Sequence, residues 1–373
     1  MRREQKQVVV QITLFIFTLI TTTVAGAEWT YSKSIFMADY SWADFISGFE
    51  FSLPFLGILT VHELGHYFTA RYHGVKATLP YYIPVPPFPL SIGTFGAVIR
   101  LRSKVYSKRH NFDIGISGPL AGFVMTLIIL IYGFTHLPEP EYIFQIHPDY
   151  QQYGLQYADH VYDNMPTEIP DITFGKNLLF LFFEKFVADP DRVPNPHELM
   201  HYPLLFASFL SLIFMCLNLL PIGQLDGGHV VYGLFGFKIH RIIATTFFIG
   251  FILYSGLGFI DLNMENKGNL AIWISCSVLF LYFSLSRLGL SKINTLMYAL
   301  LILAALLLVG QVYPELKGYS GWLAFVFIVG RFIGIQHPPS EIEEPLDGKR
   351  VILGWLALLI FVISVSPAPF MIK

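Results

Sequence analysis

Charged residues are scarce in this sequence. Lys, Arg, Asp and Glu make up 13% of its 373 residues, whereas soluble domains carry about 25%. The formal net charge is only −2, so the composition indicates no nucleic-acid partner. Cysteine is also rare: Cys216 and Cys276 are the only two, which excludes a disulfide framework and a thiolate metal site. The chemistry of the chain must therefore come from other side chains.

Apolar residues are abundant instead, at 54% of the chain, and the mean hydropathy is +0.56. A run of about 20 apolar residues crosses a bilayer as a helix. Such segments are predicted at 8–26, 45–71, 113–135, 202–222, 240–260, 269–286, 294–313, 320–335 and 351–367. We therefore predict an all-α polytopic membrane protein, in contact with membrane lipids, with eight or nine transmembrane helices. The segment 320–335 is the shortest of them.

The first of these segments has two interpretations. Met1-Arg2-Arg3, followed by an apolar run that ends in Val-Ala-Gly-Ala, is typical of a signal peptide. We favour a membrane helix, because the run approaches full spanning length. Both interpretations place residue 30 on the outside, so the orientation of the later spans does not depend on the choice.

Loop charges predict the orientation of the spans, because cytoplasmic loops carry an excess of Lys and Arg. The loop 72–112 is basic, and the loop 136–200 is acidic. The basic positions in and around the first loop are Arg71, Lys76, Arg100, Arg102, Lys104, Lys108 and Arg109. We therefore predict that 72–112 faces the cytoplasm and 136–200 the opposite side. The expected setting is a bacterial inner membrane, with the functional site towards the cytoplasm.

The second predicted span carries His62-Glu63-Leu64-Gly65-His66 near its inner end. On a helix, residues four apart lie on one face, so the two imidazoles can bind the same ion. Zinc hydrolases build their metal site on this pattern. Ionisable side chains inside a span are costly and mark function by default. The alternative interpretation is a buried polar cluster that is satisfied within the helix bundle.

A third ligand is still required, and Asp226 is the best candidate. It lies in the segment 218–228, Asn-Leu-Leu-Pro-Ile-Gly-Gln-Leu-Asp-Gly-Gly, at the inner end of the fourth predicted span. That end has the same predicted depth as the first motif. We therefore predict that His62, His66 and Asp226 bind one zinc ion per chain. Asn218 either bonds a neighbouring helix or holds a substrate backbone, and the sequence favours neither.

The metal motif occurs a second time, as His-Glu-Leu-Met-His at 197–201. Bare matches to this pattern include false positives. The apolar segment 202–220 rises about 27 Å as a helix, so Asp226 cannot reach this copy. We predict that it is only the polar start of the fourth span, with Glu198 favouring the positive end of the helix dipole.

A short strand is predicted between the second and third spans. The segment 80–89 is rich in proline and cannot be a helix, and 93–99 is apolar, β-prone and contains Gly93 and Gly96. Irregular backbone survives at membrane depth only where protein or a water-filled cavity covers it. We therefore predict that 80–102 is a re-entrant loop with a short β-strand beside the metal site. The alternative is an ordinary cytoplasmic loop.

Together these residues resemble the site-2 protease family of intramembrane zinc metalloproteases, in the branch without a PDZ domain, which includes bacterial and plastid members. The matching features are His62-Glu63-x-x-His66, the segment 93–99, Gly118-Pro119 and Asn218-x-x-Pro221-x-x-x-x-Asp226-Gly-Gly. Weaker similarities are His201-x-Pro203 and His337-Pro338-Pro339. The resemblance implies a protease that hydrolyses peptide bonds in the transmembrane segments of membrane-protein substrates.

The resemblance also implies roles for individual residues. The three predicted metal residues would be the zinc ligands, Glu63 the catalytic base and Asn218 a substrate-binding residue. A substrate helix hides its peptide bonds and must be unwound before it is cut. The strand that contains Gly93 and Gly96 can hold the freed segment by β-augmentation.

Two other classes of protein are open. A prenyl-protein type of membrane metalloprotease also carries His-Glu-x-x-His, but it would use a glutamate as third ligand, and Asp226 argues against it. A catalytically inactive membrane scaffold or a transporter is the non-enzyme alternative. The presence of Glu63 argues against an inactive relative, which has no need of a base.

The motifs and charge pattern predict five parts. They are an N-terminal transmembrane segment with an external linker (1–45), the first part of the catalytic core (46–135), the external acidic loop (136–200), the second part of the core (201–235) and the C-terminal helices (236–373).

Overall fold

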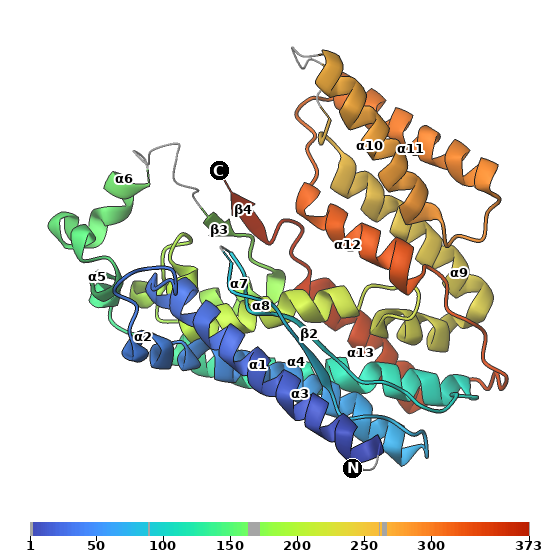
Figure 1. Cartoon of the computed structure of the whole chain (residues 1–373), viewed down its shortest axis with the longest axis horizontal. Coiled ribbons are helices and arrows are strands. Elements are labelled where there is room, and N and C mark those ends of the chain that lie inside the picture. Colours follow the sequence, from blue (N-terminus) through green and yellow to red (C-terminus); the bar gives the residue numbers. More distant parts are fainter. Residues whose placement is uncertain (1–2, 89, 163–171, 261, 263–266, 373) are drawn as a thin grey trace. The chain divides into compact units, whose positions relative to one another are not determined.

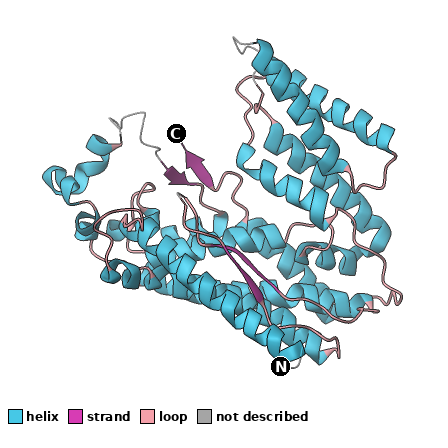
Figure 2. Cartoon of the chain, viewed as in Figure 1, coloured by secondary structure: helices cyan, strands magenta, loops and turns pink. Residues whose placement is uncertain are grey.

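Helices make up most of the chain in the computed structural model, which describes residues 3–88, 90–162, 172–260, 262 and 267–372 (Figures 1 and 2). The long helices are α1 (Arg3–Tyr31), α3 (Phe49–Tyr72), α4 (Lys108–Thr135), α8 (Pro203–Asn218), α9 (Asp226–Gly256), α10 (Lys267–Leu285), α11 (Lys292–Val312) and α13 (Gly348–Ser364). The shorter ones are α2 (Trp42–Ser47), α5 (Ile143–Ile146), α6 (Tyr157–Val161), α7 (Leu178–Phe186) and α12 (Leu323–Ile328). The strands are β1 (Tyr81–Pro84), β2 (Thr94–Val98), β3 (Ile172–Phe174) and β4 (Phe370–Ile372).

Each predicted transmembrane segment contains helix, and the chain is an all-α polytopic membrane protein as expected. Within the described ranges, six helical stretches are both long and apolar enough to cross a bilayer. Three predicted spans form shorter helices: 203–218, 320–333 and the 17-residue helix α13. The fifth predicted span is longer than expected, because α9 begins at Asp226 and continues through a break at Gly236, where φ is +76°.

The described chain divides into two compact units. The first contains Met1–Val105, Ile116–Leu217 and Ala357–Lys373, and the second contains Tyr106–Gly115 and Asn218–Leu356. The predicted His62 motif belongs to the first unit, whereas Asn218 and Asp226 belong to the second.

In the first unit, α1 packs along α3 (Figure 1). Their backbones approach closely at Gly48, where an added Cβ would lie 1.9 Å from the carbonyl oxygen of Thr23. Thr23 also shares a buried hydrogen bond of 2.8 Å with Ser52 of α3. A side chain at Gly48 would therefore separate the two helices. This approach fixes the helix that carries the first motif.

The segment 80–102 is an antiparallel hairpin of β1 and β2 rather than an ordinary loop. Tyr81 pairs with Val98 and Tyr82 with Ala97. The hairpin is held against α1, where the indole of Trp29 donates a 2.9 Å hydrogen bond to the carbonyl of Ser91. The predicted strand is thus confirmed at β2, and its partner β1, in the proline-rich stretch, was not predicted.

The acidic loop and the C-terminus of the first unit meet in a second small sheet. Strand β3 pairs antiparallel with β4, with Thr173 opposite Met371. Residues 163–171 of the predicted external loop lie outside the described residues. The pairing joins segments almost 200 residues apart, and no pattern in the sequence pointed to it.

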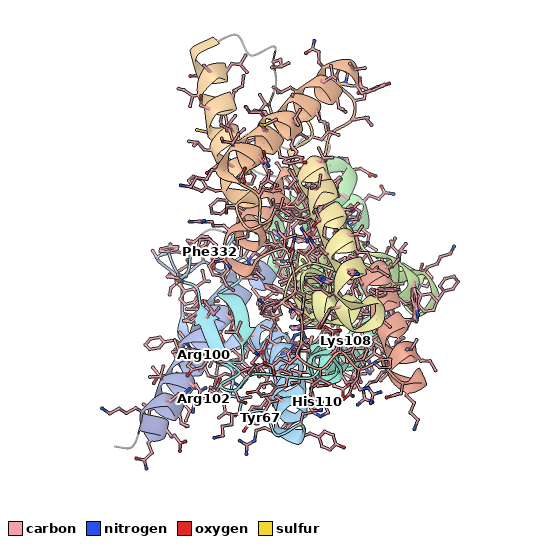
Figure 3. The ribbon with its side chains drawn as sticks, turned by 90° about the vertical axis from the view of Figure 1, so that its right-hand side faces the viewer. Tyr67, Arg100, Arg102, Lys108, His110 and Phe332 are labelled. Carbon is pink, nitrogen blue, oxygen red and sulfur yellow. The ribbon has the colours of Figure 1, made fainter. Side chains whose placement is uncertain are left out.

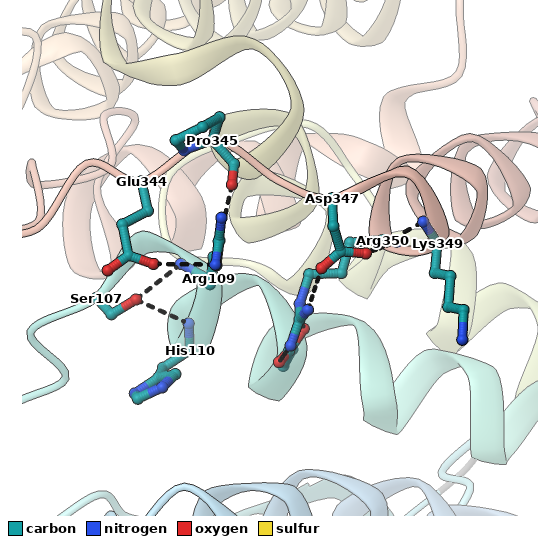
Figure 4. Close-up of polar contacts among 9 residues, drawn as sticks. Ser107, Arg109, His110, Glu344, Pro345, Asp347, Lys349 and Arg350 are labelled. Atoms are coloured by element: carbon teal, nitrogen blue, oxygen red, sulfur yellow. Dashed lines mark hydrogen bonds and ion pairs between the residues drawn. The ribbon is translucent and has the colours of Figure 1, made fainter.

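In the second unit, charged side chains join the start of α4 to the first turn of α13 and to the segment before it (Figure 4). Arg350 makes two hydrogen bonds of 2.7 Å to the carboxylate of Asp113, a bidentate geometry that is among the stronger ion pairs. Arg109 bonds the carbonyl of Pro345 at 2.7 Å and lies 3.2 Å from Glu344. Elsewhere in this unit α10 and α11 pack side by side (Figure 1).

Candidate metal centre

His62 and His66 lie on one face of α3 and are 6% and 7% exposed. Their Nε2 atoms are 3.1 Å apart, and the two rings are nearly perpendicular at 77°. Two nitrogen ligands of a tetrahedral zinc ion, each at about 2.0–2.1 Å, lie roughly 3.3 Å apart. The spacing of the two imidazoles therefore fits a shared ion, as the sequence pattern predicted.

Glu63 is also buried, at 7% exposure, and its carboxylate is oriented by backbone. Its Oε2 accepts a 2.9 Å hydrogen bond from the N–H of Ile99, directly after β2. A second contact joins the same elements: the hydroxyls of Thr60 and Tyr82 are 2.6 Å apart. Both strands of the hairpin are thus fastened to α3 beside the motif, as the prediction of a strand next to the metal site required.

Glycine clears the space that the two histidine rings occupy. An added Cβ at Gly118 of α4 would lie 2.1 Å from Nε2 of His66, and one at Gly122 would lie 3.1 Å from Cβ of His62. On α3 itself, a Cβ at Gly65 would lie 2.6 Å from the carbonyl oxygen of Ser117. The small residues of α4 thus allow α3 and α4 to pack closely. The position of the His66 ring directly at Gly118 was not predicted.

We expect Gly118→Ala to impair metal binding, because its methyl group must displace the His66 ring. Changes in the residues that support a metal ligand typically cost about 10–100-fold in metal affinity or activity. Zinc affinity and turnover should fall together by that order. Gly57→Ala in α3 is the matched control, because no atom lies within 4 Å of its added Cβ. Wild-type zinc affinity in Gly118→Ala would show that the ring does not depend on this glycine.

Asp226 is the first residue of α9, and close backbone packing shapes the turn before it. An added Cβ at Gly227 would lie 1.9 Å from the carbonyl oxygen of Leu219. Gly223 has φ of +57°, and its N–H donates a 2.9 Å hydrogen bond to the carbonyl of Ile335. The glycines around Asp226 therefore serve the fold of the turn. Asn218, the last residue of α8, is half-buried.

His229, one turn into α9, pairs with His337 of the segment before α13. His229 Nδ1 is 2.8 Å from Nε2 of His337, whose ring stacks on Tyr232 at 4.1 Å. The hydroxyl of Tyr232 accepts a 2.7 Å hydrogen bond from the N–H of Ser340 and donates one to Glu343. This network ties the start of α9 to the segment before α13. The sequence marked His337 only as a weak similarity.

The second copy of the metal motif does not open a helix, so that prediction was wrong. Residues Leu199–His201 form a 3₁₀ turn, and α8 begins only at Pro203. Glu198 therefore lies before the turn and not at the helix dipole. Burial raises the pKa of Glu198 to about 7 and lowers that of His201 to about 4. Proline at 203 explains the late start, since it fits the first position of a helix.

The family model of peptidase family M50 matches residues 50–257, which include both the first motif and Asp226. The chain belongs to this family. A probable zinc metalloprotease, EGY1, of Arabidopsis thaliana chloroplasts is 29% identical over 181 residues, 48% of this chain and 28% of that protein. The corresponding EGY2 of Oryza sativa subsp. indica is 27% identical over 188 residues, 50% of this chain and 29% of that protein.

The chain therefore matches less than a third of the length of these chloroplast relatives. No solved structure matches it. The family expected from the paired motifs is confirmed, because M50 is the family of the site-2 proteases.

Proposed function

We propose that this chain is an intramembrane zinc metalloprotease that cleaves peptide bonds within the transmembrane segments of membrane-protein substrates. The observation that carries the proposal is the pair of buried imidazoles, with Nε2 atoms 3.1 Å apart, on an apolar helix of an M50 chain. The relatives named as probable zinc metalloproteases support it. An inactive scaffold would not need these histidines and a buried glutamate on one helix.

The proposed metal ligands are His62, His66 and Asp226, which would hold one zinc ion per chain. Two imidazoles and a carboxylate suit zinc, and three protein ligands leave a fourth position for water. When bound there, zinc polarises the scissile carbonyl and lowers the pKa of its water towards neutrality.

Glu63 is proposed as the general base. Its carboxylate would accept the proton of the attacking water and pass it to the leaving amide nitrogen. The hydrogen bond from the Ile99 N–H holds this carboxylate in a fixed orientation. The base is thereby coupled to the end of β2.

We further propose that β2 holds the unwound substrate by backbone pairing. Phe95 and Val98 of this strand are 72% and 52% exposed, so part of the strand is accessible. Gly96 has φ of +98° and open space around its Cβ position, and we propose that it admits the substrate backbone. Gly93 lies against α1, because an added Cβ there would lie 2.4 Å from the carbonyl oxygen of Thr21. We therefore propose that Gly93 positions the strand and does not contact the substrate.

Asn218 is proposed as a second contact to the substrate backbone, through its side-chain amide. An amide offers both donors and an acceptor, and so can bond the peptide groups of a segment that has left its helix.

Proline in β2 should separate docking from metal binding. Tyr82 faces Ala97 and Tyr81 faces Val98 across the hairpin, and N–H groups of adjacent residues point to opposite edges of a strand. We expect Ala97→Pro or Val98→Pro, whichever removes a donor from the open edge, to lower turnover of membrane-spanning substrates while zinc content is unchanged. Val98→Ala, which keeps the N–H, is the control. Full activity in both proline variants would exclude β2 as the docking edge.

The proposed orientation places 72–112 at the cytoplasmic face and 136–200 at the opposite face. Arg100 and Arg102 of the basic loop are exposed after β2 (Figure 3), as the charge rule requires. The named relatives are chloroplast proteins, so they give no support to the bacterial inner membrane expected from the sequence. We therefore propose only that the two loops lie on opposite sides of the membrane, with 72–112 on the cytoplasmic side.

Cysteine labelling measures that sidedness. After Cys216 and Cys276 are replaced, single cysteines at Arg100 and at the exposed Asp149 should react with an impermeant maleimide from opposite sides of sealed membranes. Reaction of both from one side would contradict the proposed orientation.

Substrate cleavage tests the function itself. Detergent-purified protein should cut a model membrane protein inside its apolar segment, and mass spectrometry of the fragments locates the bond. Cuts confined to loops outside the apolar segment would indicate a membrane metalloprotease of another type. Zinc binding without any cleavage would indicate a scaffold.

A further inference from the structure

Three side chains of the first unit meet in and just after the acidic loop 136–200: His147, Glu198 and His201. Glu198 and His201 are 1% and 3% exposed, and His147 is half-buried. One ligand atom from each lies within 4.8 Å of the other two. We propose that these three residues form a second zinc site, separate from the His62 motif. This inference is independent of the proposed protease function.

The spacing of the ligand atoms suits a single ion. Nε2 of His147 is 3.1 Å from Nε2 of His201, the same separation as between His62 and His66. Nε2 of His201 is 3.5 Å from Oε2 of Glu198. Both distances are close to the roughly 3.3 Å between two ligands of tetrahedral zinc. The third pair of ligand atoms, on His147 and Glu198, lies within 4.8 Å.

Neighbouring groups orient the ligands as the outer shell of a metal site does. Nδ1 of His201 is 2.9 Å from the carbonyl oxygen of Thr30 and must donate to it. Its Nε2 therefore carries the lone pair towards His147 and Glu198. A ring N–H donated to a backbone carbonyl is the usual support of a zinc-binding histidine. Tyr162 donates its hydroxyl proton to Oε1 of Glu198, which leaves Oε2 on the side of the histidines.

The cluster also has a charge that an ion would balance. A buried carboxylate is costly unless it is paired. Among the described residues, His201 lies 3.5 Å from Glu198 and is charged only when protonated, and no Lys or Arg pairs with this carboxylate. A divalent cation on neutral imidazoles and an ionised Glu198 would satisfy all three groups at once. The cluster adjoins a cavity of about 250 Å³ that also touches Glu28 and Trp29, so an ion and a water ligand can enter.

Such a site would cross-link the two ends of the acidic loop 136–200. His147 follows α5, Glu198 and His201 precede α8, and the Thr30 carbonyl lies in the last turn of α1. One ion would join these segments, which are far apart in the chain. Because an ion that binds only the folded state stabilises it, zinc should raise the unfolding temperature through this site.

The test counts zinc in a background that lacks the first pair of histidines. Full-length His62→Ala/His66→Ala protein is purified in detergent, and zinc per chain is measured by elemental analysis after equilibration with the metal alone. We expect one equivalent to remain, and adding His147→Ala to remove it. Adding His136→Ala instead, an exposed histidine at the end of α4, should leave it. Cobalt in place of zinc should give the visible bands of a tetrahedral site only while His147 is present.

A second variant distinguishes loss of zinc binding from misfolding of the loop. Glu198→Gln keeps the shape of the side chain and its acceptor for Tyr162 but removes the charge. We expect it to abolish the rise in unfolding temperature on zinc addition in the same background, while the unfolding temperature without zinc changes little. No zinc in the His62→Ala/His66→Ala protein, or undiminished zinc after His147→Ala or Glu198→Gln, overturns the second site. If only the first site is wrong, the His62→Ala/His66→Ala protein should hold as much zinc as the wild type, and His147→Ala should still remove zinc from it.

Discussion

Glu63→Gln is expected to abolish cleavage of a membrane-spanning substrate while the protein keeps its fold and its zinc. Glutamine has the shape of glutamate and can still accept the hydrogen bond from Ile99, but it cannot take a proton from water. General acid–base catalysis typically contributes about 10²–10⁴-fold, so the rate should fall by at least that factor. Fragment yield over time, measured with purified protein in detergent, gives the rate directly.

Glu50→Gln is the matched control, because Glu50 is an exposed acid at the start of the same helix. It should cleave at the wild-type rate. Zinc content and unfolding temperature should be the same in both variants and the wild type. Cleavage by Glu63→Gln at the wild-type rate would remove this residue from the mechanism and direct attention to another proton acceptor.

The first motif could be predicted from the sequence because its spacing determines its geometry locally. Residues four apart on a helix must share a face, so the approach of His62 and His66 follows once α3 forms. Gly118-Pro119 of α4 could also be recognised from the sequence, as part of the family motif. The structure adds which atom occupies the space, namely the His66 ring at Gly118.

Strand β1 was missed because its sequence argues against a strand. Proline cannot donate to a ladder and is confined to edges and ends of strands. Pro84 is the last residue of β1, and β1 pairs only with β2 among the described strands, so neither restriction is violated.

The early start of α9 was missed for a related reason. Gly227 and Gly228 lower helix propensity, but the close approach of Gly227 to Leu219 compensates through packing.

Contacts between distant segments could not be predicted at all. His147 and His201 are 54 positions apart, and the paired strands β3 and β4 are separated by about half of the chain. Sequence periodicity reports only on neighbours within a helix or strand. The second metal motif illustrates the limit: its pattern suggested that His197 and His201 act together, whereas the structure pairs His201 with His147. A 3₁₀ turn at Leu199–His201 breaks the helical spacing on which the pattern depends.

His66→Ala is expected to lose the zinc of the first site and, with it, all cleavage. Removal of a ligand should weaken zinc more than the roughly 10–100-fold that loss of a supporting residue costs, because two remaining ligands cannot close a tetrahedral site. The His66 ring lies directly against Gly118 of α4. Elemental analysis should show one equivalent less zinc per chain than the wild type.

The matched control is His73→Ala, which removes a histidine at the end of the same helix, outside the metal motif. It should keep both zinc and activity. Zinc at the proposed second site does not affect this comparison, because His66→Ala should lose one equivalent of zinc whether or not His147→Ala is also present. Asp226→Ala should match His66→Ala in zinc content and rate if the carboxylate is the third ligand. Undiminished zinc in His66→Ala would contradict the first site, whereas a loss in His66→Ala but not in Asp226→Ala would confine the error to the third ligand.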